Sequence, residues 1–433
     1  LTTTKEFMMK QIVHDKDNSK IIQSIYQNDR MAFLKWHKGK CTTIEPGIIE
    51  LQPGVEYETM ALLWAEKGVI TFPSGHSMDG HSDLLVDLHT FFKSKILIDD
   101  KYIWLMAAYT YYTWFYDSLT TAPYLFIVGD YGTAKTRILE LLQLVCFNPV
   151  NLGTSVTNAN IFRVQDMARG TLIIDEFEKN ASSKNDNYAQ ILNNGYSYPG
   201  IVIRSESDGK KFTPKAFTVF GPKIIGAREL PNDKALISRC FLIRTEHHTN
   251  DELIQSNIPL DLKDKDRADG EMLRNRMLGL RFAKSNKRPQ LRKGIKFGTS
   301  RPRNVQLLQS ILSVMPSQFQ HRIVSILESL LIGSSAYQNS QIEMDVVTAL
   351  DIILRNKYPD WKNVLPISIS LKEIDTIILE GAKRHYSNRE LGMAAEAMGL
   401  KKTRHGTGTK VKIVSASELS ELIERYLGVM DTV

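Results

Sequence analysis

Four short apolar runs recur along the middle of the chain. They are YLFIV at 124–128, TLIID at 171–175, PKIIGA at 222–227 and FLIRT at 241–245. Apolar runs of this length are typical of strands that are buried in a parallel sheet. A helical pattern at 136–145 follows the first run. Strands that alternate with helices predict an α/β sheet with crossover helices.

The segment before this pattern is harder to interpret. Strand-like pieces at 47–52 and 68–73 are punctuated by Gly and Pro, so residues 1–85 are expected to form a small mixed accessory region. A helical pattern begins at His81. The aromatic run at 102–119 is the one candidate for a membrane span, but its Thr and Tyr hydroxyls would need partners in lipid. We therefore predict a buried helix there and no membrane partner.

The second half of the chain adds a hairpin, charged helices and a separate module. IVIR and FTPKAFTV flank the polar stretch SESDGKK, which predicts a hairpin at 201–218. Charged helices and a basic linker follow, then two or three further helices and a Pro-containing joint at 358–366. The expected organisation is an accessory region at 1–85, a core with its preceding helices at 86–300, a helical connector at 301–360 and a small module at 367–433.

Composition limits the classes of partner and compartment. The chain holds 55 Lys and Arg against 48 Asp and Glu, a net charge of +7. A basic balance favours an acidic partner such as nucleic acid, the alternative being a basic surface that is only solvated. Cys41, Cys146 and Cys240 lie too far apart for a disulfide framework or a short-spaced zinc cluster. Because no signal pattern is visible in residues 1–18, a reducing cytoplasm fits best.

A phosphate-binding loop is predicted between the first apolar run and its helix. The segment reads VGDYGTAKT at 128–136, so the Gly that usually precedes the Lys is Ala134, which is acceptable where its φ stays negative. Backbone N–H groups would wrap the phosphates of ATP, Lys135 would reach the β- and γ-phosphates, and the Thr136 hydroxyl would ligate Mg²⁺. The alternative is a chance Gly-rich turn. The candidate nucleotide-binding residues are Gly129, Asp130, Tyr131, Gly132, Thr133, Ala134, Lys135 and Thr136.

A second motif supports the same site. LIIDEFEK at 172–179 ends a buried strand in two adjacent carboxylates, Asp175 and Glu176, which are costly to bury unless they meet a cation. Asp175 is expected to hold Mg²⁺, and Glu176 to polarise the water that attacks the γ-phosphate. The alternative is a pair that only caps the following helix.

The motifs at 129–142, 169–180 and 235–245 together resemble those of the minichromosome-maintenance (MCM) helicases. These are AAA+ ATPases, and they too carry Ala before the Lys. The resemblance implies a P-loop core with a helical subdomain, and an oligomer whose site is completed in trans. Arg239 would be the arginine finger that reaches a neighbour's γ-phosphate. The looser match PRNVQLLQSIL at 302–312 nominates Arg303 as sensor 2, with Arg301 close by.

This chain departs from the MCM pattern at three places. The sensor-1 stretch GARELP at 226–231 has Arg228 or Glu229 where the family has Asn. The linker before the acidic motif is too short for the family's helix insertion, and residues 1–85 contain a single Cys and so no zinc ribbon. The chain is more similar to AAA+ helicases and initiators of mobile elements, of the staphylococcal cassette or pathogenicity-island type.

Two segments are candidates for DNA contact. The predicted hairpin occupies the slot of a pore hairpin, and it carries Arg204, Lys210 and Lys211; its alternative is an ordinary exposed hairpin. The module at 367–433 resembles a winged helix, whose basic residues would touch DNA; its alternative is a module for protein contacts. Its candidate contacts are Lys401, Lys402, Arg404 and Lys410.

The leading hypothesis is an ATP-dependent DNA helicase that acts in replication of a mobile element as a homo-oligomer, expected to be a hexamer. One alternative is an origin-binding initiator or helicase loader that hydrolyses ATP without unwinding. The other is an AAA+ protein remodeller, which would present an aromatic–hydrophobic pore loop where this hairpin presents Lys and Ser.

Overall fold

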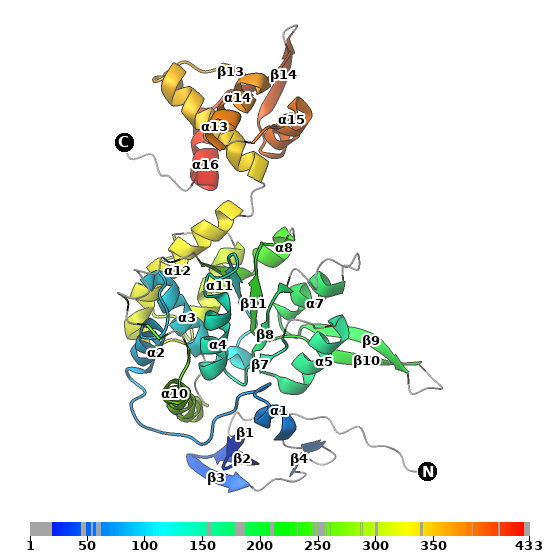
Figure 1. Cartoon of the computed structure of the whole chain (residues 1–433), viewed down its shortest axis with the longest axis vertical. Coiled ribbons are helices and arrows are strands. Elements are labelled where there is room, and N and C mark those ends of the chain that lie inside the picture. The colour runs from blue at the N-terminus through cyan, green and yellow to red at the C-terminus, as the bar shows by residue number, and fades with distance from the viewer. Residues whose placement is uncertain are drawn as a thin grey trace. The chain divides into compact units, whose positions relative to one another are not determined.

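The chain divides into two compact units, Leu1–Glu328 and Ser329–Val433, which we describe separately. The computed structural model describes most of both (Figure 1). The described residues are 20–44, 49–52, 55–57, 62–153, 157–177, 187–207, 212–231, 233–245, 248, 256, 258–259, 261–285, 287, 289–298, 302–337, 341–382, 384–405 and 408–427.

A five-stranded parallel sheet forms the centre of the larger unit. Its strand order is β12-β6-β11-β8-β7, and every neighbouring pair runs parallel. The bounds are β6 (Tyr124–Val128), β7 (Val150–Asn151), β8 (Leu172–Ile174), β11 (Lys223–Ala227) and β12 (Cys240–Arg244). The four predicted apolar runs supply four of these strands, and every residue of β6 and β11 is buried. The α/β prediction is therefore confirmed at the level of a mixed fold with a parallel sheet.

Helices pack around this sheet. The predicted aromatic helix is α3, where eleven residues are buried and the Tyr109 hydroxyl donates to the carbonyls of Pro123 and Lys223 at 2.9 and 3.0 Å. Among the described residues, no helix is long and apolar enough to cross a membrane. The helices of this unit are α1 (Leu62–Glu66), α2 (Leu84–Lys93), α3 (Asp100–Thr113), η1 (Tyr116–Ser118), α4 (Lys135–Val145), α5 (Asn158–Ala168), α7 (Asn187–Gly195), α8 (Lys234–Ile237), α10 (Asp264–Ala283) and α11 (Pro302–Leu312), with α12 (Ser317–Tyr337) spanning the boundary.

The predicted hairpin is present as β9 (Ile201–Ser207) and β10 (Phe212–Thr218), which pair antiparallel and extend from the sheet domain in Figure 1. One face of the hairpin packs on α5, where the rings of Phe162 and Phe217 lie 4.8 Å apart. The tip, with Lys210 and Lys211, lies outside the described residues.

The N-terminal region contains strands that the sequence pattern did not predict: β1 (Lys20–Gln27), β2 (Arg30–His37) and β3 (Lys40–Ile44), which form an antiparallel sheet. β4 (Ile49–Gln52), which pairs with β5 (Val55–Tyr57), lies within the strand-like piece expected at 47–52. In β1 the polar Gln23 and Ser24 are buried among Ile residues, which obscures the pattern. The strand-like piece expected at 68–73 forms only an isolated bridge from Ile70 to Val150.

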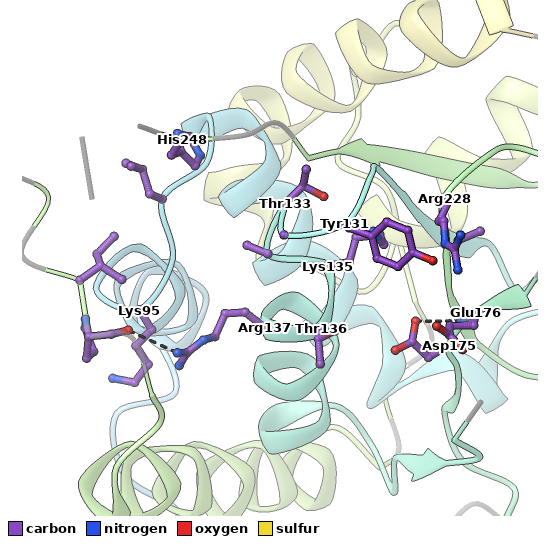
Figure 2. Close-up of a pocket in the computed structure, with 16 residues that line it drawn as sticks. Lys95, Tyr131, Thr133, Lys135, Thr136, Arg137, Asp175, Glu176, Arg228 and His248 are labelled. Carbon is purple, nitrogen blue, oxygen red and sulfur yellow. Dashed lines mark hydrogen bonds between the residues drawn. The ribbon is translucent and has the colours of Figure 1, made fainter. Parts of the chain in front are cut away.

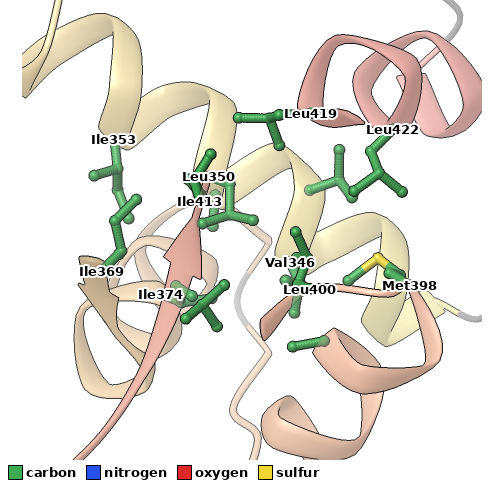
Figure 3. Close-up of a cluster of buried hydrophobic side chains, with 14 of the residues drawn as sticks. Val346, Leu350, Ile353, Ile369, Ile374, Met398, Leu400, Ile413, Leu419 and Leu422 are labelled. Carbon is green, nitrogen blue, oxygen red and sulfur yellow. The ribbon is translucent and has the colours of Figure 1, made fainter. Parts of the chain in front are cut away.

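The smaller unit folds around one hydrophobic core (Figure 3). Its elements are α13 (Gln341–Lys357), η2 (Trp361–Asn363), β13 (Ile367–Ser370), α14 (Leu371–Ala382), α15 (Asn388–Ala397), β14 (Lys401–His405), β15 (Gly408–Ile413) and α16 (Ala416–Leu427). The strands form an antiparallel sheet in the order β13-β15-β14. The unit begins well before the predicted boundary at 367, because Val346, Ile353 and Trp361 share the core of the later elements. The segment interpreted as a joint is thus part of this core.

Lys223 gives the larger unit a testable pH dependence. Its side chain is fully buried in β11, where Nζ donates to the carbonyls of Val219 and Gly221 at 2.8 and 3.0 Å, and burial lowers its pKa from 10.5 to about 7. Between these two pH values the unfolded chain holds one more proton than the folded chain. The free energy of unfolding should therefore rise with pH, by up to about 1.4 kcal/mol per pH unit.

We expect urea unfolding between pH 7 and 9 to show this rise in the wild type. Lys223→Met removes the titrating group, so it should flatten the rise and lower stability through the two lost hydrogen bonds. The exposed Lys265→Met is the matched control and should keep the wild-type slope. A Lys223→Met variant with the wild-type slope would contradict the assignment.

Candidate nucleotide-binding site

The central cavity lies at the carboxyl edge of the parallel sheet, which is where ligands bind in open α/β sheets. Three neighbouring strands deliver its polar groups: β6 leads into the loop 129–134, β8 into Asp175 and Glu176, and β11 into Arg228. The cavity has a volume of about 460 Å³. Its lining residues are Lys95, Leu97, Tyr131, Gly132, Thr133, Ala134, Lys135, Thr136, Arg137, Asp175, Glu176, Ala227, Arg228, His248, Ile258 and Pro259.

The loop between β6 and α4 is held from behind by hydroxyl groups. The Thr133 hydroxyl donates to the carbonyl of Asp130 and accepts from the Thr245 hydroxyl, both at 2.7 Å. A Cβ at Gly129 would lie 2.0 Å from the Thr245 hydroxyl, so only glycine fits there. Gly129 thus allows the loop to pack closely on the end of β12.

Lys135 is the first residue of α4, and its side chain turns back over the loop. Its Nζ donates to the carbonyls of Gly129 and Asp130 at 2.5 and 2.6 Å. The ammonium therefore lies at the centre of the loop, where a phosphate cradled by the loop would meet it. Of the predicted loop residues, Tyr131 to Thr136 line the cavity, whereas Gly129 and Asp130 contribute these carbonyls.

The expectation that Ala134 keeps a negative φ is wrong. Its φ is +66°, close to the +70° of Gly132, so the alanine adopts the left-handed conformation that the glycine of the usual motif would adopt. For an alanine this conformation costs about 1–2 kcal/mol. The loop path is retained although the residue is not glycine, which shows that the surrounding contacts impose the path.

The two carboxylates face the loop across the cavity. Asp175 accepts the backbone N–H of Glu176 at 2.8 Å and lies beside Gly226 of β11, where an added Cβ would come within 2.9 Å of its Oδ1. Glu176 has a φ of +50°, a strained value for a residue of this type. Figure 2 shows both carboxylates below the loop and close to Arg228.

Arg228 fills the position at the end of β11 where the related motif has a polar residue. Its guanidinium lies 3.9 Å from the ring centroid of Tyr131, which is 62% exposed, and both residues line the cavity (Figure 2). Glu229, the other candidate, does not line it. Of the two residues that the sequence offers for the sensor-1 position, Arg228 is the one that lines the cavity.

The end of the cavity far from Arg228 has an apolar lining, and a cluster of buried charged residues lies beside it. Leu97, Ile258 and Pro259 line it, and Arg137 donates to the carbonyl of Pro259 at 3.3 Å. Lys95 has a 7% exposed side chain and forms ion pairs of 3.0 and 3.3 Å with Asp266 and Asp269 of α10. The sequence gave no signal for this end, because its residues come from separate segments.

Arg239 and Arg303 lie together at the amino-terminal end of the strands, opposite to the end that forms the cavity. Both guanidinium groups face the buried ring of Tyr196, at 5.6 and 4.8 Å from its centroid. Burial and the neighbouring Arg303 charge lower the pKa of Arg239. Within the described residues, the buried Nε of Arg239 has no hydrogen-bond acceptor. An anion placed between the two groups would satisfy both.

Neither arginine reaches the cavity of its own chain. The Arg239 carbonyl accepts from the N–H of Tyr124, the first residue of β6, whereas the loop follows the last residue. The five residues of β6 therefore separate Arg239 from the loop by about 16 Å along the strand direction. Arg303, which the sequence nominated as a nucleotide contact, is likewise absent from the cavity lining.

The predicted DNA contacts fall into different environments. Arg204 lies on β9 over the ring of Phe162, at 5.9 Å. In the smaller unit, Lys402 forms a 2.8 Å ion pair with Glu396 of α15. Lys401 and Lys410 lie on the other face of the β14–β15 hairpin, because side chains alternate along a strand. Lys412 lies on the same face; it was not predicted, although the alternating TKVKI pattern at 409–413 indicates it. The side chain of Arg404 lies outside the described part.

Ala134 provides a direct test of the loop conformation. Ala134→Gly removes the left-handed penalty but adds freedom to the unfolded chain, so we expect a net gain of about 0.5–1 kcal/mol in the free energy of unfolding. The reverse change at the other left-handed position, Gly132→Ala, should lower the free energy of unfolding by about 0.5–1 kcal/mol, because the reduced freedom of the unfolded chain offsets part of the left-handed penalty. Both are measured by urea denaturation. A loss of stability in Ala134→Gly would show that the alanine is unstrained.

Three solved structures that align with this chain share 12% or 13% sequence identity with it. No protein-family model and no curated protein matches the chain. Among solved structures, two apo structures of the NrS-1 C-terminal region align with TM-scores of 0.35 and 0.36 at 12% and 13% identity, each over 91% of this chain and 97% and 96% of theirs. A structure of JCV helicase with a bound acetamide compound aligns with a TM-score of 0.27 at 12% identity, over 62% of this chain and 64% of that one. Superpositions this loose carry no argument about activity.

Proposed function

We propose that the chain is an ATP-hydrolysing AAA+ motor that moves along DNA, as the replicative helicase of a mobile element. One observation carries the proposal: a loop with Lys135 and Thr136 at the carboxyl edge of a parallel sheet faces two adjacent carboxylates across one cavity. The same combination of groups is what phosphoryl transfer to water requires. A reducing cytoplasmic setting remains part of this proposal.

The roles in the cavity follow from chemistry. Lys135 would exchange its two backbone carbonyl partners for phosphate oxygens of ATP. Asp175 and the Thr136 hydroxyl offer the oxygen ligands that Mg²⁺ prefers, and both line the cavity. Bound Mg²⁺ would neutralise charge on the phosphates. Glu176 is the candidate base for the attacking water, because the turn that follows β8 aims it into the same space.

Arg228 is proposed to contact the γ-phosphate from the same chain. It stacks on Tyr131 of the loop, and its guanidinium lies in the cavity with Asp175 and Glu176. A guanidinium presents several donors in a fixed plane, which suits a phosphate with three terminal oxygens. The charge of an arginine here replaces the uncharged amide that the MCM-like motif places at this position.

Arg239 and Arg303 are proposed to act together on the ATP of a neighbouring subunit. They lie side by side at the sheet edge opposite to the cavity, and Arg239 has a buried donor without an acceptor in the described residues. A second subunit that presents its cavity to this pair would supply the missing anion. The proposal requires a homo-oligomer, and a ring such as a hexamer satisfies every subunit equally.

DNA contact is proposed for the hairpin and for the smaller unit. The order helix, strand, two helices and a β-hairpin in α13 to β15 is that of a winged helix. Lys401, Lys410 and Lys412 lie on one face of its wing, and a basic face of this kind binds the phosphate backbone. The hairpin β9–β10 would meet the strand that is moved.

One observation favours a second candidate, an AAA+ protein remodeller. The outer face of the hairpin exposes large apolar side chains: Ile203 is 64% exposed and Phe212 is 79% exposed. The Lys and Ser residues of the predicted turn argue against this candidate, whereas these apolar side chains argue for it. Exposed aromatic and aliphatic groups grip unfolded peptide, although they also stack on nucleobases. The substrate therefore has to be decided by experiment.

The decisive assay compares a forked DNA duplex with an unfolded protein as substrate. We expect ATP-dependent strand separation on the fork and no ATP-dependent processing of the protein. Lys135→Ala should abolish ATP hydrolysis, and Glu176→Gln should keep ATP binding but slow hydrolysis by about 10²–10⁴-fold. Wild-type hydrolysis by Lys135→Ala would refute the site. ATP hydrolysis without strand separation would instead favour the loader or the remodeller.

Mixing experiments test the trans-acting arginine pair. Arg239→Ala subunits mixed with Lys135→Ala subunits should recover part of the ATPase activity, because some interfaces then combine an intact loop with intact arginines. Arg303→Ala mixed with Lys135→Ala should recover activity for the same reason. Arg239→Ala mixed with Arg303→Ala should not, since every donor then lacks one arginine. Rescue in this last mixture would show that the two act at different sites.

A further inference from the structure

One end of the N-terminal sheet is basic, and nothing in the nucleotide site uses it. β2 ends and β3 begins in the sequence KWHKGK at 35–40, and the register places Lys20 of β1 opposite His37, which in turn lies opposite Lys40. Lys20, His37 and Lys40 thus form one row across three strands. Lys35 lies in the next row on the same face, and Lys38 occupies the turn.

The opposite face of these strands is fixed to the motor. The Trp36 ring stacks on Phe282 at the end of α10, with centroids 5.2 Å apart and planes 3° from parallel. Cys41, which pairs with Trp36 in the register, lies 3.7 Å from the Nδ1 of His76. The basic face is therefore held in a fixed orientation, because its reverse side is packed.

The arrangement concentrates like charges. Lys35 and Lys40 are diagonal neighbours on one face of β2 and β3, and such neighbours lie about 7–8 Å apart, within reach of two long side chains of like charge. Lys38 and Lys40 are exposed and Lys35 is half-buried. Among the residues that the structure describes, none of these three lysines has an acidic partner within ion-pair distance. An external anion would relieve the repulsion.

The two turns of this sheet differ in the residues that adopt a positive φ. The β1–β2 turn has Asn28 and Asp29 at φ +49° and +58°, and both residue types tolerate the left-handed region well. The β2–β3 turn has Lys38 and Gly39 at φ +49° and +80°. A two-residue turn of this kind prefers Asn before Gly, so Lys38 occupies a position where it costs stability.

We propose that this basic end, formed by Lys35, Lys38 and Lys40, binds the phosphate backbone of nucleic acid. Cations on two adjacent strands and the turn between them can contact phosphates without reading bases. Thr42 lies opposite Lys35 on the same face, and its exposed hydroxyl donates to the Lys35 carbonyl at 3.4 Å, a long hydrogen bond that a phosphate oxygen could replace. The choice of nucleic acid over an anionic lipid surface rests on the proposed function. The site itself does not involve the ATP cavity.

Lys38→Asn separates folding from binding. Asn suits the turn better than Lys, so the variant should unfold at a higher temperature than the wild type and yet bind DNA more weakly. Fluorescence anisotropy with a labelled single-stranded oligonucleotide, across a series of salt concentrations, measures the binding. A Lys38→Asn variant that is more stable and binds DNA with unchanged affinity and salt slope would overturn the proposal.

The triple variant Lys35→Ala, Lys38→Ala, Lys40→Ala should lower the salt slope by up to about 2, at about 0.7 per lost contact on a single strand. The control removes the same charge from exposed residues elsewhere: Lys265→Ala, Arg267→Ala, Lys293→Ala. The control should keep the wild-type slope, and an equal loss in both triples would overturn the proposal. The proposal would also be overturned if the triple variant lost binding to phosphatidylserine vesicles but bound DNA like the wild type.

These outcomes are distinguishable from failure of the helicase proposal. The salt slope is measured without ATP, and strand separation is measured on the fork. If the triple variant loses slope while the wild type separates no strands, the binding site stands and the helicase assignment fails. If the wild type separates strands and the triple variant keeps the full slope, the reverse holds.

Discussion

All five strands of the central sheet run in the same direction, and the placement of every proposed catalytic group depends on that polarity. Loops that leave the carboxyl ends of β6, β8 and β11 must meet, so Lys135, Asp175 and Arg228 converge although they are far apart in sequence. The residue that precedes β12 must lie at the opposite edge, which is where Arg239 is found. One subunit therefore presents the loop and the arginine pair on different sides.

The sequence predicted those parts of the fold that depend on short local patterns of residues. Buried apolar runs predicted four core strands, and the loop and acidic motifs predicted which residues line the cavity. The prediction failed where tertiary contacts decide. Gln23 is buried in β1 because Asn148 supplies its hydrogen bond from a distant segment at 2.9 Å. Trp361 joins the core of the smaller unit despite the prolines around it. No periodicity encodes either contact.

The candidate site was predictable in its residues but not in their geometry. The motif allowed Ala134 at the position of a glycine, yet its left-handed φ emerges only from a loop pinned by Thr133 and Thr245. Glu176 has a similarly unfavourable φ. Both sides of the cavity thus hold a residue in a strained conformation, and contacts in the rest of the fold must stabilise it. The site is therefore arranged before a ligand binds, and binding requires little rearrangement. The pairing of Arg239 with Arg303 around Tyr196 required three segments to be placed together.

The two carbonyl partners of Lys135 have a consequence for turnover. An ammonium left alone in an emptied phosphate loop would be poorly solvated, and the vacated state would be high in energy. Here the carbonyls of Gly129 and Asp130 accept hydrogen bonds from the ammonium group. Under the proposed function, product dissociation would exchange phosphate oxygens for these carbonyls as acceptors. If the loop binds nucleotide as proposed, its own backbone would compete with the nucleotide for Lys135, which would favour product release over product retention.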